Sequence, residues 1–146
     1  DKFIGDCVMA FFGAPMAQQD HAARAVRAAI EVQRAIDGWN RDRRARGASP
    51  VLARIAINTG PVVVGDVGSN RRVDYTILGN TVNVAARLED AAAGPGEIVI
   101  GGATFDELGN GFLTESLGEL QLKGLQQRVP VYRVLWREEE EGAHPG

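Results

Sequence analysis

The sequence YTILGNTVNVAARLE, residues 75–89, joins a strand-like segment to a helix-like segment and so sets the order of elements in the fold. Its first residues have the aromatic and β-branched composition of a strand, whereas the repeat that follows places apolar residues at helical spacing. At about 100° per residue, three polar residues fall on one narrow stripe: Asn80, Asn83 and Arg87. The face expected to pack against the core is formed by Val82, Ala85, Ala86 and Leu88.

The segments on either side of this stretch predict an α+β domain with antiparallel hairpins and crossover helices. Strands are expected at 51–58, as a glycine-punctuated pair between 61 and 78, at 97–100, near 112–122 and near 129–136. A long amphipathic helix is expected at about 19–46, because apolar residues recur there at helical spacing and a glycine follows its arginine-rich end. Further helices are expected at 80–92 and 102–109.

The stretch KFIGD, residues 2–6, begins a predicted hairpin whose connection is Gly5-Asp6. Glycine as the first of two connecting residues is typical of a type II′ turn. A carboxylate on such a turn, with backbone carbonyls beside it, offers the oxygen ligands that a hard divalent cation prefers, so Asp6 is a candidate Mg²⁺ ligand. Aspartate is also common in turns for purely local reasons, and this segment alone leaves both interpretations open.

The polar stripe that contains Asn80 also allows two interpretations. Asn83 and Arg87 are four residues apart, so their side chains project together and could hold a ribose and a phosphate. Alternatively, Arg87 forms an ion pair with Glu89 or Asp90. Asn80 would then cap the start of the helix, which is the role that its position favours.

The glycine-rich stretch TGPVVVGDVGS, residues 59–69, matches neither the phosphate-binding loop G-x-x-x-x-G-K-[ST] nor the dinucleotide-binding loop G-x-G-x-x-G. Hairpin turns explain its glycines, and we assign it no chemistry. His21 and Cys7 have no partner at the spacing of metal ligands, so both are interpreted as structural.

Composition and charge limit the function classes. The 146 residues are 45% hydrophobic and 24% charged, which predicts one globular domain. The formal net charge of -3 argues against nucleic acid as a partner, because phosphate-binding surfaces are usually strongly basic. No apolar run approaches the roughly 20 residues that span a bilayer, so no direct membrane contact by this domain is expected. A single cysteine suits a reducing compartment, and we expect a cytoplasmic location.

The two ends of the chain differ from its body. The chain begins inside a predicted hairpin, so we expect it to belong to a longer protein, which could be membrane-anchored through other segments. Residues 137–146, REEEEGAHPG, contain almost no apolar side chains and are expected to form an acidic, disordered tail.

Three stretches, in this order and at this spacing, resemble the class III nucleotidyl cyclase catalytic domain, in particular that of bacterial adenylate cyclases. They are DKFIGDCVMAFFGAP (1–15), ARIAINTGPVVVGDVGS (53–69) and DYTILGNTVNVAARLE (74–89). The resemblance runs over residues 1–136. It implies the ferredoxin-like cyclase fold, with a mixed, mostly antiparallel sheet and crossover helices, of which the N-terminal portion is absent from this chain.

The resemblance also implies an active site shared by two subunits that pair head to tail. Asp6 matches an aspartate that holds Mg²⁺ or Mn²⁺, of which the family binds two ions per site. Lys2 and Thr76 match the pair that contacts the purine base. Asn83 matches the residue that orients the ribose, and Arg87 matches the residue that steadies the reacting phosphate.

Two departures from the family pattern bear on activity. The family's first metal-binding aspartate lies on an earlier strand that this chain does not contain, so the chain as given is expected to turn over ATP poorly. In QLKGLQQ, residues 121–127, only Lys123 remains of a pair of lysines that some members use for the triphosphate, because Leu125 stands at the second place. Lys123 is therefore a weak candidate for phosphate binding.

The function that the resemblance implies is that of a homodimeric adenylate cyclase, which converts ATP to 3′,5′-cyclic AMP and pyrophosphate. Lys2 favours ATP over GTP, because an ammonium group only donates hydrogen bonds and so suits the acceptor N1 of adenine rather than the N1–H of guanine. The alternative from a different class is a non-catalytic, cyclase-like module that binds nucleotide or regulates a partner by dimerising.

Overall fold

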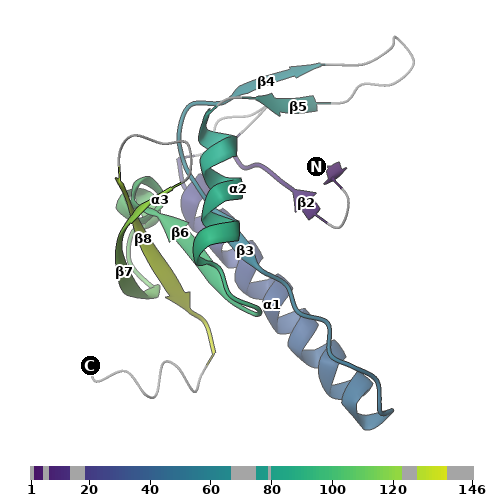
Figure 1. Ribbon diagram of the computed structural model, residues 1–146. Coiled ribbons are helices and arrows are strands. Elements are labelled where there is room, and N and C mark those ends of the chain that lie inside the picture. Colours follow the sequence, from purple (N-terminus) through teal and green to yellow (C-terminus); the bar gives the residue numbers. More distant parts are fainter. Residues whose placement is uncertain are drawn as a thin grey trace.

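The helices and strands follow one another in the order that the sequence predicts (Figure 1). The computed structural model describes residues 2–4, 7–13, 19–66, 75–78, 80–122 and 128–137. The helices are α1 (His21–Ala45), α2 (Asn80–Ala92) and α3 (Gly102–Leu108). The strands are β1 (Lys2–Ile4), β2 (Cys7–Met9), β3 (Ile55–Ile57), β4 (Val63–Asp66), β5 (Tyr75–Leu78), β6 (Ile98–Gly101), β7 (Leu113–Gln121) and β8 (Arg128–Leu135).

The central sheet is mixed and mostly antiparallel, with strand order β3-β6-β8-β7. β3 and β6 are parallel, with Ala56 opposite Val99, and the chain between them includes α2. β8 is antiparallel to both of its neighbours. The β1-β2 and β4-β5 hairpins form separate two-stranded antiparallel sheets. The predicted α+β class, with its mixed sheet and crossover helices, is therefore confirmed.

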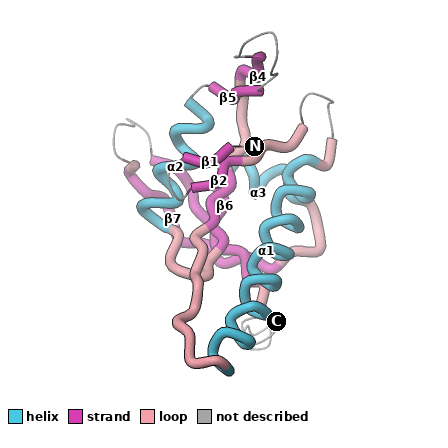
Figure 2. The backbone as a smooth tube through the Cα atoms, turned by 90° about the vertical axis from the view of Figure 1, so that its right-hand side faces the viewer, coloured by secondary structure: helices cyan, strands magenta, loops and turns pink. Residues whose placement is uncertain are grey.

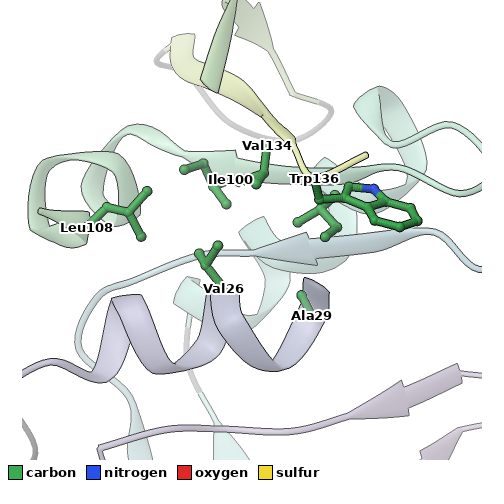
Figure 3. Packing of buried hydrophobic residues seen from close by; sticks show 7 residues of the cluster. Val26, Ala29, Ile100, Leu108, Val134 and Trp136 are labelled. Atoms are coloured by element: carbon green, nitrogen blue, oxygen red, sulfur yellow. The ribbon is translucent and has the colours of Figure 1, made fainter. Parts of the chain in front are cut away.

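One face of the central sheet is covered by α1 and α3. Successive residues of a strand point to opposite faces, and Ile98 and Ile100 of β6 point to this one. Both are fully buried in a cluster with Val26 and Ala29 of α1 and Leu108 of α3 (Figure 3). The small Ala29 lets the long helix lie close to the strands, which anchors α1 to the sheet.

The opposite face of the sheet is covered by α2. Val99, which lies between the two isoleucines of β6, is fully buried with Val84 and Leu88 of α2 and with Val131 of β8. Figure 2 shows α1 and α2 on opposite sides of β6. The helix that carries the polar stripe is thus fixed to the sheet by a core of its own.

The edge strand β3 is shorter than the sequence predicts, because residues 51–54 are not part of the strand. Side chains of α1 form hydrogen bonds with the backbone of these residues instead. The fully buried Asn40 accepts a hydrogen bond from Val51 N and donates one to Val51 O, at 2.8 and 2.7 Å. Gln33, also buried, donates to Ala53 O and to Glu97 O. The expected strand at 51–58 was therefore wrong at its beginning and correct at 55–57.

The long helix α1 ends as its sequence predicts. Gly47 follows it with a φ of 75°, a conformation that glycine adopts without strain. Arg43 donates to Ser49 O at 2.7 Å, so the arginine-rich end also ties the helix to the following loop. No helix in the described part of the chain has the length and apolar character needed to cross a membrane.

Candidate functional site

The two candidates for base recognition lie on the two hairpins outside the central sheet. Lys2 begins β1, and its backbone lies opposite Met9 of β2. Thr76 is the second residue of β5, and its backbone lies opposite Gly65 of β4. Both predicted hairpins are therefore present, and they place these residues at defined strand positions.

The candidates for ribose and phosphate lie on α2, one turn apart. Asn83 is exposed and Arg87 is half-buried. Arg87 already takes part in an interaction within the chain. Asn80 is exposed and begins the helix. The structure thus keeps Asn83 and Arg87 together on the side of α2 that does not face the core.

The packing face of α2 differs in part from the one that the sequence predicts. The buried residues are Val84, with 8% of its surface exposed, and Leu88, with none, whereas Ala86 is exposed. At about 100° per residue, Val84 and Leu88 lie roughly 40° apart, and Ala86 lies about 160° from Leu88. The expectation that Ala86 packs against the core was wrong, because the larger pair, Val84 and Leu88, decides which side of the helix turns inward.

The start of α2 is bonded to the segment that follows β3. Thr81 Oγ1 donates a hydrogen bond to Pro61 O at 2.7 Å. Asn58 Nδ2 donates to Thr81 O at 3.1 Å. Neither Asn58 nor Thr81 was predicted to matter from the sequence. The signal that could have found Asn58 is the sequence Asn58-Thr59-Gly60, in which polar residues follow a strand and precede a glycine.

The carboxyl ends of the parallel strands β3 and β6 meet beside this contact. A Cβ atom on Gly101, the last residue of β6, would lie 2.8 Å from Asn58 Oδ1, so the two residues are in close contact. The next residue, Thr59, shares a 2.8 Å hydrogen bond with the fully buried Thr104 of α3. Adjacent residues after β3 therefore contact helices on opposite faces of the sheet.

Two predicted site residues, Asp6 and Lys123, lie outside the described residues, as does most of the predicted tail at 137–146. Within the described residues, no three or more histidine, cysteine, aspartate or glutamate side chains are grouped so that they could hold a metal ion. His21 Nε2 instead lies 3.5 Å from Oε2 of Glu107 on α3, which agrees with a structural role.

Shifted pKa values in the described part of the chain belong to ion pairs of the scaffold. A hydrogen bond from Arg24 lowers the pKa of the exposed Asp20 carboxyl. Hydrogen bonds to Glu115 and Glu97, each 2.6 Å long, raise the pKa of Arg133. The Arg133 pairs join β8 to β7 and to the start of β6, so they stabilise the sheet.

Comparisons with known proteins agree on one family. The family described as "Adenylate and Guanylate cyclase catalytic domain" matches residues 2–135. Adenylate cyclase 1 of Rhizobium meliloti strain 1021 is 36% identical over 135 residues, which are 92% of this chain and 20% of that protein. The chain therefore spans about a fifth of the length of this relative.

Solved structures extend the agreement to the fold. The adenylyl cyclase CyaB from P. aeruginosa has a TM-score of 0.83 and 38% identity, over 92% of this chain and 70% of that chain. The guanylate cyclase domain of RhGC from Catenaria anguillulae, solved with GTP, has a TM-score of 0.72 and 30% identity, over 85% and 64%. The predicted cyclase fold is therefore confirmed, and the similar proteins include cyclases named for either nucleotide.

Proposed function

The chain belongs to the family of adenylate and guanylate cyclase catalytic domains, and we propose that it makes 3′,5′-cyclic AMP and pyrophosphate from ATP. The observation that carries this proposal is the placement of Asn83 and Arg87 one turn apart on α2, on the side away from the core. Their matches to the ribose-orienting and phosphate-steadying residues of the family support the assignment.

The reaction is an in-line attack of the ribose 3′-oxygen on the α-phosphorus, with pyrophosphate as the leaving group. Asn83 holds the ribose through hydrogen bonds of its amide, so that the 3′-oxygen is aligned for attack. Arg87 meets the negative charge that grows on the phosphoryl oxygens, because its planar guanidinium stays charged and donates several hydrogen bonds in a fixed geometry. These two residues supply positioning and charge rather than covalent chemistry.

Asp6 is the one residue of this chain that we propose as a ligand of the metal ions. Its carboxylate is the hard oxygen ligand that Mg²⁺ and Mn²⁺ prefer, and it follows β1 directly in the chain after a single glycine. When bound, such ions lower the pKa of the attacking hydroxyl and neutralise the triphosphate. Lys123 is proposed to contact the triphosphate as a point charge.

Base choice rests on Lys2 and Thr76. The Lys2 ammonium donates to N1 of adenine and would meet a donor in guanine, whereas the Thr76 hydroxyl can either donate or accept. Lys2 thus favours ATP, and Thr76 does not oppose it. The similarity to adenylate cyclases from bacteria supports the same choice.

The site is proposed to form between two copies of the chain arranged head to tail, in the cytoplasm. One subunit would supply Asp6, and the other would supply Lys2, Thr76, Asn83 and Arg87. This division follows the family pattern and predicts that an isolated subunit has no complete site.

The test is turnover by the purified full-length protein with Mn²⁺ and either ATP or GTP, with the cyclic nucleotide measured directly. We expect cyclic AMP from ATP and at least about tenfold less cyclic GMP from GTP, which corresponds to about 1.4 kcal/mol of discrimination. Cyclic GMP alone would refute the base assignment and leave the cyclase reaction intact. No product from either nucleotide would refute the enzyme and favour the non-catalytic module.

A further inference from the structure

We propose that Asn58 and Thr81 are positioning residues that fix the start of α2 and, through it, the placement of Asn83 and Arg87. This inference rests on the proposed function, because it assigns these contacts a role in the same reaction. Thr81 lies in the first turn of α2 and Asn58 follows β3, and neither is proposed to touch the nucleotide.

The start of α2 is held through two different groups of one residue. The Thr81 hydroxyl donates to Pro61 O at 2.7 Å, and the Thr81 carbonyl accepts from Asn58 Nδ2 at 3.1 Å. Both partners come from the short segment 58–61 that leaves the central sheet at the end of β3. A helix start held by both a donor and an acceptor cannot slide or turn without breaking one of the two bonds.

The space around these bonds leaves little room for another arrangement. A Cβ atom on Gly60 would lie 2.6 Å from Thr81 Oγ1, and one on Gly101 would lie 2.8 Å from Asn58 Oδ1. Glycine at position 60 therefore lets the segment after β3 approach Thr81, and glycine at position 101 leaves room for the Asn58 side chain. The contact is thus built from β3, β6 and the helix together.

Geometry connects the start of α2 to the candidate site. Asn83 and Arg87 lie about 200° and 240° around the helix from Thr81, so they project from the side opposite the contact. A helix is rigid over two turns, and a small rotation at Thr81 moves both side chains together. A misplacement of about 1 Å at reacting groups can lower a rate about a hundredfold.

The experiment compares three variants of the full-length protein. Thr81→Val removes the hydroxyl and keeps the branched shape, Thr81→Ser keeps the hydroxyl, and Thr114→Val makes the same change on β7 as a matched control. With ATP and Mn²⁺, we expect Thr81→Val to lower kcat at least about tenfold with KM changed less than about twofold, because alignment and not binding is lost. Thr81→Ser and Thr114→Val should keep kcat within about threefold of the unchanged protein, since both retain the bond.

Hydrogen exchange of the α2 amides supplies a readout that does not need turnover. We expect Thr81→Val, but neither other variant, to speed exchange in the first turns of α2 at least about tenfold, while amides of β6 and β8 keep their rates. If Thr81→Val does not fold, Asn58→Ala replaces it and should give the same pattern. Unchanged kcat and unchanged exchange would overturn the positioning role.

Failure of the proposed function is recognised separately. If the unchanged protein makes no cyclic nucleotide, the proposed function fails, and the exchange rates of α2 then decide whether Asn58 and Thr81 fix the helix. If Thr81→Ser is as impaired as Thr81→Val, the hydroxyl is not the group that matters, and the inference is overturned.

Discussion

The guanidinium of Arg87 is the single group on which the proposed chemistry depends most. Arg87→Lys keeps the positive charge but loses the planar fork of donors, so we expect kcat to fall at least about a hundredfold. Steady-state kinetics with ATP measure the effect. Arg41→Lys on the exposed surface of α1 is the matched control and should leave kcat unchanged. If the Arg87→Lys protein retained half of its kcat, charge alone would suffice and the assigned role would be wrong.

A second residue-scale prediction concerns stability rather than activity. Arg133 bonds Glu97 and Glu115 at 2.6 Å each, and its side chain is 30% exposed. Arg133→Gln leaves two carboxylates facing a neutral side chain, so we expect the free energy of unfolding to fall by about 1.5–3 kcal/mol. Urea unfolding measures this loss. Arg24→Gln removes an exposed pair with Asp20 and should leave the urea midpoint nearly unchanged, which makes it the control.

At the scale of elements, the sequence predicts α2, the hairpins and the last two strands closely, because their signals are local. The helix begins at Asn80 and ends at Ala92, as the spacing of its apolar residues and the following Gly94 indicate. The early start expected for β3 was wrong, because Asn40, eleven residues earlier in the chain, bonds both backbone groups of Val51. Such a contact leaves no mark on the local pattern.

The contact between Gly60 and Thr81 gives a prediction about how two elements fit. Gly60→Ala places a methyl group 2.6 Å from Thr81 Oγ1, whereas Thr81→Ala removes that oxygen and leaves only Cβ, 3.5 Å away. We expect Gly60→Ala to cost about 1 kcal/mol more in the unchanged protein than in the Thr81→Ala background. Urea unfolding of the four proteins in this cycle measures the difference.

The control is a second cycle in which Gly38→Ala takes the place of Gly60→Ala. Gly38 is a helical glycine of α1, and a Cβ atom added to it would meet only Arg41, at 3.7 Å. Gly38→Ala and Thr81→Ala have no shared partner, so their effects should add within about 0.5 kcal/mol. If the effects of Gly60→Ala and Thr81→Ala on the free energy of unfolding were also additive, the added methyl group would not clash with Thr81, and the prediction would be wrong.

At the scale of the whole molecule, the candidate residues belong to separate parts of the fold. Lys2 and Thr76 lie on two hairpins outside the central sheet, whereas Asn83 and Arg87 lie on α2. The sequence predicted these residues by their resemblance to a family, and it could not predict Asn58 or Thr81, whose bond joins positions 23 residues apart. Nor does the sequence of one chain reveal which residues of a shared site come from the second subunit.

Mixed dimers test that division of the site. A subunit carrying Asp6→Ala lacks a metal ligand, and a subunit carrying Arg87→Ala lacks the phosphate contact, so each homodimer should be inactive. When the two proteins are mixed and allowed to exchange subunits, half of the dimers are mixed, and each of these contains one site with both defects and one site with none. We therefore expect cyclic AMP formation to return to about a quarter of the unchanged rate, since only one site in four is intact.

A mixture of Asn83→Ala with Arg87→Ala is the control, because both changes fall on the same side of the proposed site and every site then lacks a residue. No recovery in the first mixture, once subunit exchange has been verified, would mean that each subunit holds a complete site of its own. Recovery in the control would mean that Asn83 and Arg87 reach one site from different subunits.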